Sequence, residues 1–251
     1  MLPDNYQIVK FEEKYLPELA RIFVAAFDDG VLFFSEVEDT RVKTTRPDSE
    51  LEPSPRRKKL ETAVRDILKL FGQVFSDGFL VAVDENDKPQ GFIIVISGVK
   101  SLWKEAAFGG HLFRYFRRWL QGQYGLTLFD VGKVIYNKIY YIAFSVKGTA
   151  EAQILSLAIS PEARGQGLGS SLTGAGLDYL REIGIKKVKL EVRPDNPAAK
   201  HIYEKHGFQV IGKAKDLHDD WYVMEANLTK EEVHKKEDDH KNDTREESDI
   251  E

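Results

Sequence analysis

The chain has 251 residues, 42% hydrophobic and 11% aromatic, which is enough apolar material for a sizeable folded core. It contains no cysteine, which excludes disulfides, thiolate nucleophiles and cysteine-ligated metal centres. The net charge of -5 comes from Thr229 to Glu251, where ten Asp/Glu stand against five Lys/Arg; the remainder is neutral. The first residues lack the features of a signal peptide, and no apolar run reaches the roughly 20 residues that span a bilayer. A cytoplasmic protein is therefore expected.

The first part of the chain predicts a β-then-α opening followed by a hairpin. Residues Tyr6 to Phe11 favour a strand and Leu16 to Phe27 a helix. The polar, proline-containing stretch from Ser35 to Pro55 is typical of a long connection. A second helix is predicted from Pro55 to Phe75, with one apolar face made of Leu60, Ala63, Val64, Ile67, Leu68 and Phe71. Two strands, Gly78 to Asp84 and Gln90 to Ser97, flank the turn formers of DENDKP.

A basic and aromatic insertion follows, at residues 100–149. Between Lys100 and Lys147 it has eight Lys/Arg and two Asp/Glu among many aromatic residues. In HLFRYFRRWL the helical spacing predicts an apolar face opposite a basic one, with Leu112, Phe116, Trp119 and Leu120 against Arg114, Arg117 and Arg118. The aromatic residues could pack on the sheet, shape an acceptor site, dock an acidic partner or contact a membrane surface. Membrane contact is not the favoured alternative.

The last third of the folded part alternates strands and helices. Strands are predicted at Gln153–Ile159, Lys187–Val192, Phe208–Lys213 and Trp221–Leu228, and helices at Gly167–Ile183 and Pro197–His206. The prediction is an α/β fold: a single domain over residues 1–228, with a mixed β-sheet flanked by helices and the helical insertion placed before a cofactor-binding strand. Residues 229–251 are expected to be a solvated, disordered tail without chemistry.

The glycine-rich stretch RGQGLGS, Arg164 to Ser170, runs directly into a predicted helix. A dinucleotide fingerprint would need a third glycine where Ser170 stands, and a nucleotide-hydrolysing P-loop would need a lysine after the glycines. A ligand-free turn is a further alternative. The favoured interpretation is a pyrophosphate site, in which backbone N–H groups of Gly165, Gln166, Gly167, Leu168, Gly169 and Ser170 converge at the positive end of the helix beside Arg164.

Two motifs carry a resemblance to a known family. Arg164, Gly167 and Gly169 form R-x-x-G-x-G, which resembles the acetyl-CoA loop of the GCN5-related N-acetyltransferases, the GNAT family. Downstream, KLEVRPDNPAAKHIYEKHGF, from Lys189 to Phe208, is similar to that family's second motif, most of all in ribosomal-protein N-terminal-alanine acetyltransferases. The resemblance covers Gln153 to Leu228 closely and Tyr6 to Ser97 in element order only.

The resemblance implies roles for individual residues. Leu157 and Ile159 would bond the pantetheine arm, with the Leu157 N–H polarising the acetyl carbonyl. Tyr203 matches the general acid that protonates the departing thiolate, and Asn196 matches a residue that holds the pantetheine or caps the following helix.

The general base is less determined. Glu191 matches the glutamate that deprotonates the amine through water, and its alternative is a solvated strand residue paired near Arg193. Gln153 stands where other members have a glutamate, and a neutral amide is no base. His201 and His206 are expected at the surface, and no metal site is expected.

The resulting hypothesis is an acetyl-CoA-dependent N-acetyltransferase. A primary amine, from a protein N-terminus, a lysine or a small molecule, would attack acetyl-CoA directly in a ternary complex. The alternative is an acyl-CoA-binding sensor or scaffold without turnover. No nucleic-acid-binding motif is present, so no nucleic-acid partner is expected.

Overall fold

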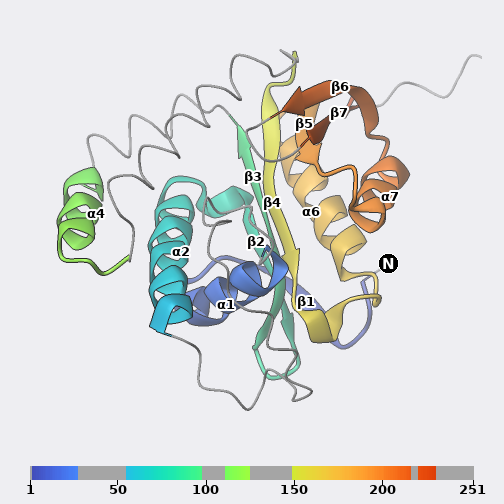
Figure 1. Cartoon of the computed structure of the whole chain (residues 1–251). Helices are drawn as coiled ribbons and strands as arrows, with labels where there is room; N and C mark the ends of the chain where they lie inside the picture. The colour runs from blue at the N-terminus through green and yellow to red at the C-terminus, as the bar shows by residue number, and fades with distance from the viewer. Residues whose placement is uncertain (1, 28–54, 98–110, 125–148, 216–219, 230–251) are drawn as a thin grey trace, which may run out of the picture.

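A seven-stranded mixed sheet runs through the molecule in the order β1-β2-β3-β4-β5-β7-β6 (Figure 1). The computed structural model describes residues 2–27, 55–97, 111–124, 149–215 and 220–229. Within them, β4 and β5 form a parallel pair and the other neighbouring strands are antiparallel. The strands are β1 (Tyr6–Lys10), β2 (Phe79–Asp84), β3 (Pro89–Ser97), β4 (Ala152–Ile159), β5 (Lys187–Val192), β6 (Gln209–Lys215) and β7 (Asp220–Asn227).

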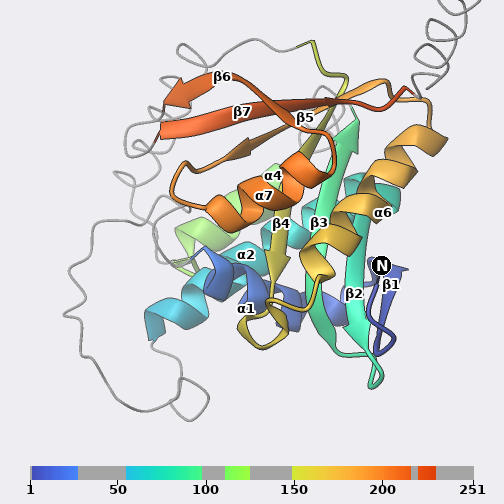
Figure 2. The same cartoon turned by 90° about the vertical axis from the view of Figure 1, so that its right-hand side faces the viewer.

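Helices cover both faces of this sheet (Figures 1 and 2). Helices α1 (Leu16–Ala26) and α2 (Pro55–Val74) lie on one face, and α6 (Leu168–Glu182) and α7 (Pro197–Lys205) lie on the other. The short helix α4 (His111–Leu120) lies outside α2, away from the sheet. Single 3-10 turns at Glu13–Tyr15, Ser76–Gly78 and Pro161–Ala163 join these elements.

The sheet separates two apolar cores because side chains alternate between its faces. In β2, Phe79, Val81 and Val83 pack against α1 and α2, whereas Ala82 packs toward α6. Strands β2 and β3 are almost wholly buried, since helices cover both of their faces.

The predicted fold is confirmed, and the observed strands and helices begin and end within two residues of the predicted ones. Residues 35–54 of the predicted connection, residues 230–251 of the tail and most of the insertion lie outside the described residues. Two predicted helix faces each have one residue out of place. Ile67 is 44% exposed, and Arg118 points from α4 toward α2 instead of lying with Arg114 and Arg117. Arg118 is drawn toward α2 by its bond to Asp66, described below.

Candidate active site

A gap opens between β4 and β5 at the centre of the sheet. The two strands pair only at Ala152 with Val188 and at Gln153 with Lys189. Beyond this point, β4 continues along β3 while β5 continues along β7, so the two strands diverge (Figure 2). From Ile154 onward, the edge of β4 that faces β5 therefore has no strand beside it among the described residues.

The backbone of β4 presents hydrogen-bonding groups to this gap. Ser160 N donates to Gln90 O at 2.8 Å, so residues 90 and 160 form a hydrogen-bonded pair. In an antiparallel ladder such pairs alternate with pairs whose polar groups point outward. Leu157 opposite Ile93 and Ile159 opposite Gly91 fall in the outward positions, so their N–H and C=O groups face the gap. Arg164 Nε accordingly reaches Ile159 O at 3.4 Å.

A bulge at Leu155 lets β4 pair with β3 and also pack against α6 on both sides of the bulge. Ile154 pairs with Val95 and Ser156 with Ile94, which leaves Leu155 as an extra residue without a partner in β3. Ile154 packs toward α6, and so do Leu157 and Ile159 three and five positions later. The extra residue thus shifts the alternation and keeps α6 covered on both sides of the bulge.

The glycine-rich loop lies between β4 and α6. Gly165 and Gly167 have φ of +76° and +84°, the left-handed conformation that favours glycine, and a Cβ added at either would meet no protein atom within 4 Å. Gly167 caps α6 without a side chain, and the first bond within the helix is from Ser171 N to Gly167 O. The N–H groups of residues 168–170 therefore have no partner within the helix. The loop presents backbone donors, the Arg164 cation and open space, a set suited to an anion.

Helix α7 packs against the start of α6, close to this loop. A Cβ added at Gly169 would lie 3.1 Å from Ile202 Cδ1 and 3.9 Å from Ile159 Cγ1, so glycine lets α7, α6 and β4 meet closely. Tyr203, on the same helix, is buried with its ring centroid 5.8 Å from that of Phe208. Burial raises the pKa of Tyr203 to about 12, so its hydroxyl is protonated at neutral pH.

Asn196 caps the start of α7. Its Oδ1 accepts a hydrogen bond from Ala199 N at 3.0 Å, which satisfies one of the free donors of that helix. The capping function predicted for Asn196 is confirmed.

Glu191 lies on the sheet face opposite Tyr203. Val188, Leu190 and Val192 point toward α6, so the intervening Lys189 and Glu191 point to the other face. Glu191 Oε1 lies 3.7 Å from Lys189 Nζ. Arg193, the partner considered for Glu191 from the sequence, bonds Asp195 at 2.8 Å.

The profile of the acetyltransferase (GNAT) family matches residues 44–208, well over half of the chain. The chain belongs to the GNAT family. Its fold is similar to that of a GCN5-related N-acetyltransferase from Kribbella flavida, with a TM-score of 0.51, 16% identity, and coverage of 90% of this chain and 99% of that one. At this identity the similarity concerns the fold alone.

Curated relatives of this GNAT chain match over shorter stretches. A mycothiol acetyltransferase of Geodermatophilus obscurus is 46% identical over 59 residues, which is 24% of this chain and 19% of that protein. A mycothiol acetyltransferase of Renibacterium salmoninarum is 30% identical over 152 residues, 59% of this chain and 31% of that protein. A Bacillus subtilis protein named as a ribosomal protein bS18-alanine N-acetyltransferase is 39% identical over 70 residues, 28% of this chain and 46% of that protein. The chain thus spans less than half the length of each of these relatives.

Two contacts of the GNAT loop are not visible in the sequence pattern. Tyr6 Oη of β1 donates to Gln166 Oε1 at 2.9 Å, and Gln166 Nε2 donates to Glu162 O at 3.2 Å. Gln166 therefore braces the loop with its side chain. Ser170 Oγ lies 3.0 Å from His206 Nε2, and burial lowers the pKa of this histidine. Tyr6 and His206 lie 160 and 36 residues from their partners, beyond the reach of local patterns.

The described residues include no group of three or more His, Asp or Glu that could hold a metal ion. In the same part of the chain, no helix is long and apolar enough to cross a membrane.

Proposed function

We propose that this chain is an N-acetyltransferase that transfers an acetyl group from acetyl-CoA to a primary amine in a ternary complex. The observation that carries the proposal is the gap between β4 and β5, which has outward backbone groups on one wall and leads to an open glycine loop at the start of α6. The acetyltransferase domain would comprise residues 1–228, with residues 100–149 as an insertion. A cytoplasmic location remains a prediction.

The residues of the gap and loop fit acetyl-CoA. Backbone N–H groups of residues 165–170 would bind the pyrophosphate, and Arg164 would add a formal positive charge. No carboxylate interrupts the stretch from Arg164 to Ser170, so nothing within it opposes an anion. Leu157 and Ile159 would bond the pantetheine amides, and Asn196 would fix the start of α7 alongside. Bound acetyl-CoA would supply the thioester carbonyl that the amine attacks, and the Leu157 N–H would stabilise the charge that develops on its oxygen.

Proton transfer would use the two faces of the sheet. Tyr203, on the α6 side, holds a proton at neutral pH and would deliver it to the thiolate. Glu191, on the opposite face, would take the proton of the amine through a water molecule. An acid on one side of the gap and a base on the other suit an amine that enters from one face while the sulfur departs on the other. No covalent enzyme intermediate is needed.

The acceptor class remains a primary amine of a protein N-terminus, a lysine or a small molecule. The names of the relatives include a protein, the ribosomal protein bS18, and also mycothiol. Because the matches span only part of those proteins, they do not select between the two classes for this chain.

The first test is calorimetric titration of the purified chain with acetyl-CoA, and separately with NAD and ATP. Saturable binding of acetyl-CoA, and no binding of NAD or ATP, is expected. A panel of free amines and N-terminal peptides would then be screened for acetylation. Binding of acetyl-CoA without turnover of any amine would favour the sensor or scaffold alternative. Failure to bind acetyl-CoA would refute the proposed activity.

A further inference from the structure

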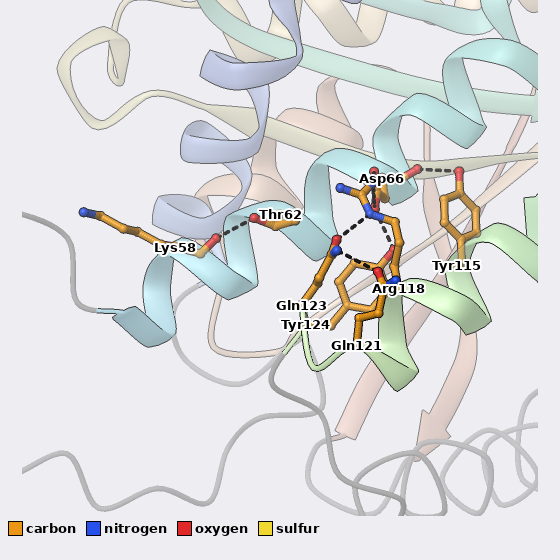
Figure 3. A network of polar contacts seen from close by, with 8 residues as sticks. All are labelled: Lys58, Thr62, Asp66, Tyr115, Arg118, Gln121, Gln123 and Tyr124. Carbon is orange, nitrogen blue, oxygen red and sulfur yellow. Dashed lines mark hydrogen bonds and ion pairs between the residues drawn. The ribbon is translucent and has the colours of Figure 1, made fainter.

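A buried polar network fixes α4 on α2 (Figure 3). Asp66 of α2 is only 9% exposed, and both of its carboxylate oxygens lie 2.6 Å from Arg118 Nη1 of α4. Tyr124 Oη donates to Asp66 Oδ2 at 2.6 Å, and Tyr115 Oη donates to the backbone oxygen of Asp66 at 3.0 Å. Burial raises the pKa of both tyrosines, so both hydroxyls remain donors at neutral pH. One carboxylate-bearing residue thus receives bonds from three side chains of the insertion.

This anchoring sets which side of α4 faces outward. At about 100° per residue, Tyr115 and Arg118 share the side of the helix that contacts α2. Phe113, Phe116 and Leu120 lie on the opposite side and are 74%, 54% and 65% exposed. We name these three residues the α4 apolar stripe. An amphipathic helix normally turns its apolar side toward the core, so this orientation is the reverse of the usual one.

Exposed basic side chains lie on the same helix as the α4 apolar stripe. Arg114 and Arg117 are exposed on the same helix, and the segment 111–124 contains no acidic residue. On α2, Lys59 and Arg65 are exposed, Glu61 pairs with Arg57 at 3.5 Å and Asp66 pairs with Arg118. Within residues 111–124, the exposed apolar side chains are thus accompanied by arginines and by no carboxylate.

We propose that the α4 apolar stripe docks this protein on an anionic phospholipid surface. Helix α4 lies beyond α2 at the edge of the described structure (Figure 1). A helix at the edge of the structure with an outward apolar side can lie along a membrane plane. Phenylalanine and leucine would enter the headgroup boundary while Arg117 bonds the phosphates. The packing of these aromatic side chains on the sheet, considered from the sequence, does not occur for Phe113 and Phe116.

Co-sedimentation of the full chain with vesicles tests this proposal. The vesicles are phosphatidylcholine alone and phosphatidylcholine mixed with phosphatidylglycerol. The unmodified chain is expected to sediment with the anionic vesicles and to be released as salt is added. The triple variant Phe113→Ser, Phe116→Ser, Leu120→Ser should lower the partition coefficient at least about tenfold, and Arg117→Gln about fivefold.

A matched control removes exposed apolar side chains elsewhere. Val210 and Ile211 of β6 are also exposed, and Val210→Ser with Ile211→Ser should leave vesicle binding unchanged. Far-UV circular dichroism and thermal unfolding check that each variant folds, without reference to acetyl-CoA. Equal sedimentation of the unmodified chain and the triple variant would overturn the proposal. So would retention on an acidic polypeptide or on nucleic acid without any binding to anionic vesicles. Neither result bears on whether the gap binds acetyl-CoA.

Discussion

Gly167 and Gly184 lie at opposite ends of α6 and form a matched pair for testing the proposed phosphate site. Their φ angles are +84° and +78°, and a Cβ at either would meet no protein atom within 4 Å. An L-residue in the left-handed conformation costs about 1–2 kcal/mol relative to glycine. Gly167→Ala and Gly184→Ala should therefore lower the free energy of unfolding by similar amounts, with a fall in Tm of a few degrees, about 2–4 °C for each kcal/mol.

The two variants should differ in their affinity for acetyl-CoA. Only at position 167 would the added methyl group enter the space proposed for the pyrophosphate. Loss of one charge-assisted hydrogen bond is worth about 1.5–3 kcal/mol, which raises Kd more than about tenfold.

Calorimetry measures the affinity, and thermal unfolding without ligand measures the shared stability cost. If Gly167→Ala binds acetyl-CoA as tightly as Gly184→Ala does, the loop does not hold the phosphates. If the two variants differ widely in Tm, similar φ angles do not give similar stability costs at these two positions.

Three further predictions concern proton-carrying groups. Tyr203→Phe should lower kcat about tenfold to a hundredfold with acetyl-CoA affinity nearly unchanged, and full activity in steady-state assays would exclude Tyr203 as the acid. Glu191→Gln should lower activity at neutral pH and recover in part at high pH, where more of the amine is already neutral; a loss that is constant across the pH profile would contradict a base. His206→Gln should alter the pH dependence of stability. Because burial lowers the pKa of His206, the unfolded chain binds more protons below about pH 6.5, and the unmodified protein loses stability as pH falls through that value. Chemical denaturation at pH 7.5 and pH 5.5 should give a smaller difference for the glutamine variant, and equal differences would argue against this linkage.

The sequence predicts the elements well where their pattern is local. Strands β2 and β5 and helices α1 and α6 match because apolar spacing and flanking turn residues determine them within a few positions. The loop and the α7 motif likewise lie in one continuous stretch, so the candidate acetyl-CoA residues could be named in advance.

The features that were not predicted depend on distant contacts. Asp66 lies on the polar side of α2, opposite the buried Val64 and Leu68, and its contact with Arg118, 52 residues away, explains its burial. The bulge at Leu155 leaves no trace in AQILSLAI, since an apolar run without alternation does not reveal an extra residue. Tyr6 resembles any strand tyrosine until β1 and the loop are brought together.

The divergence of β4 and β5 also affects the rigidity of the molecule. Along this seam, two residue pairs join the half of the sheet made by β1 to β4 to the half made by β5, β7 and β6. Resistance to bending at the seam then rests largely on α6 and on the apolar core beneath it. A ligand that bonded Leu157 and Ile159 on one side and the start of α6 on the other would link the elements on either side of this seam. Its binding would slow amide exchange in both halves of the sheet and make them unfold as one cooperative unit.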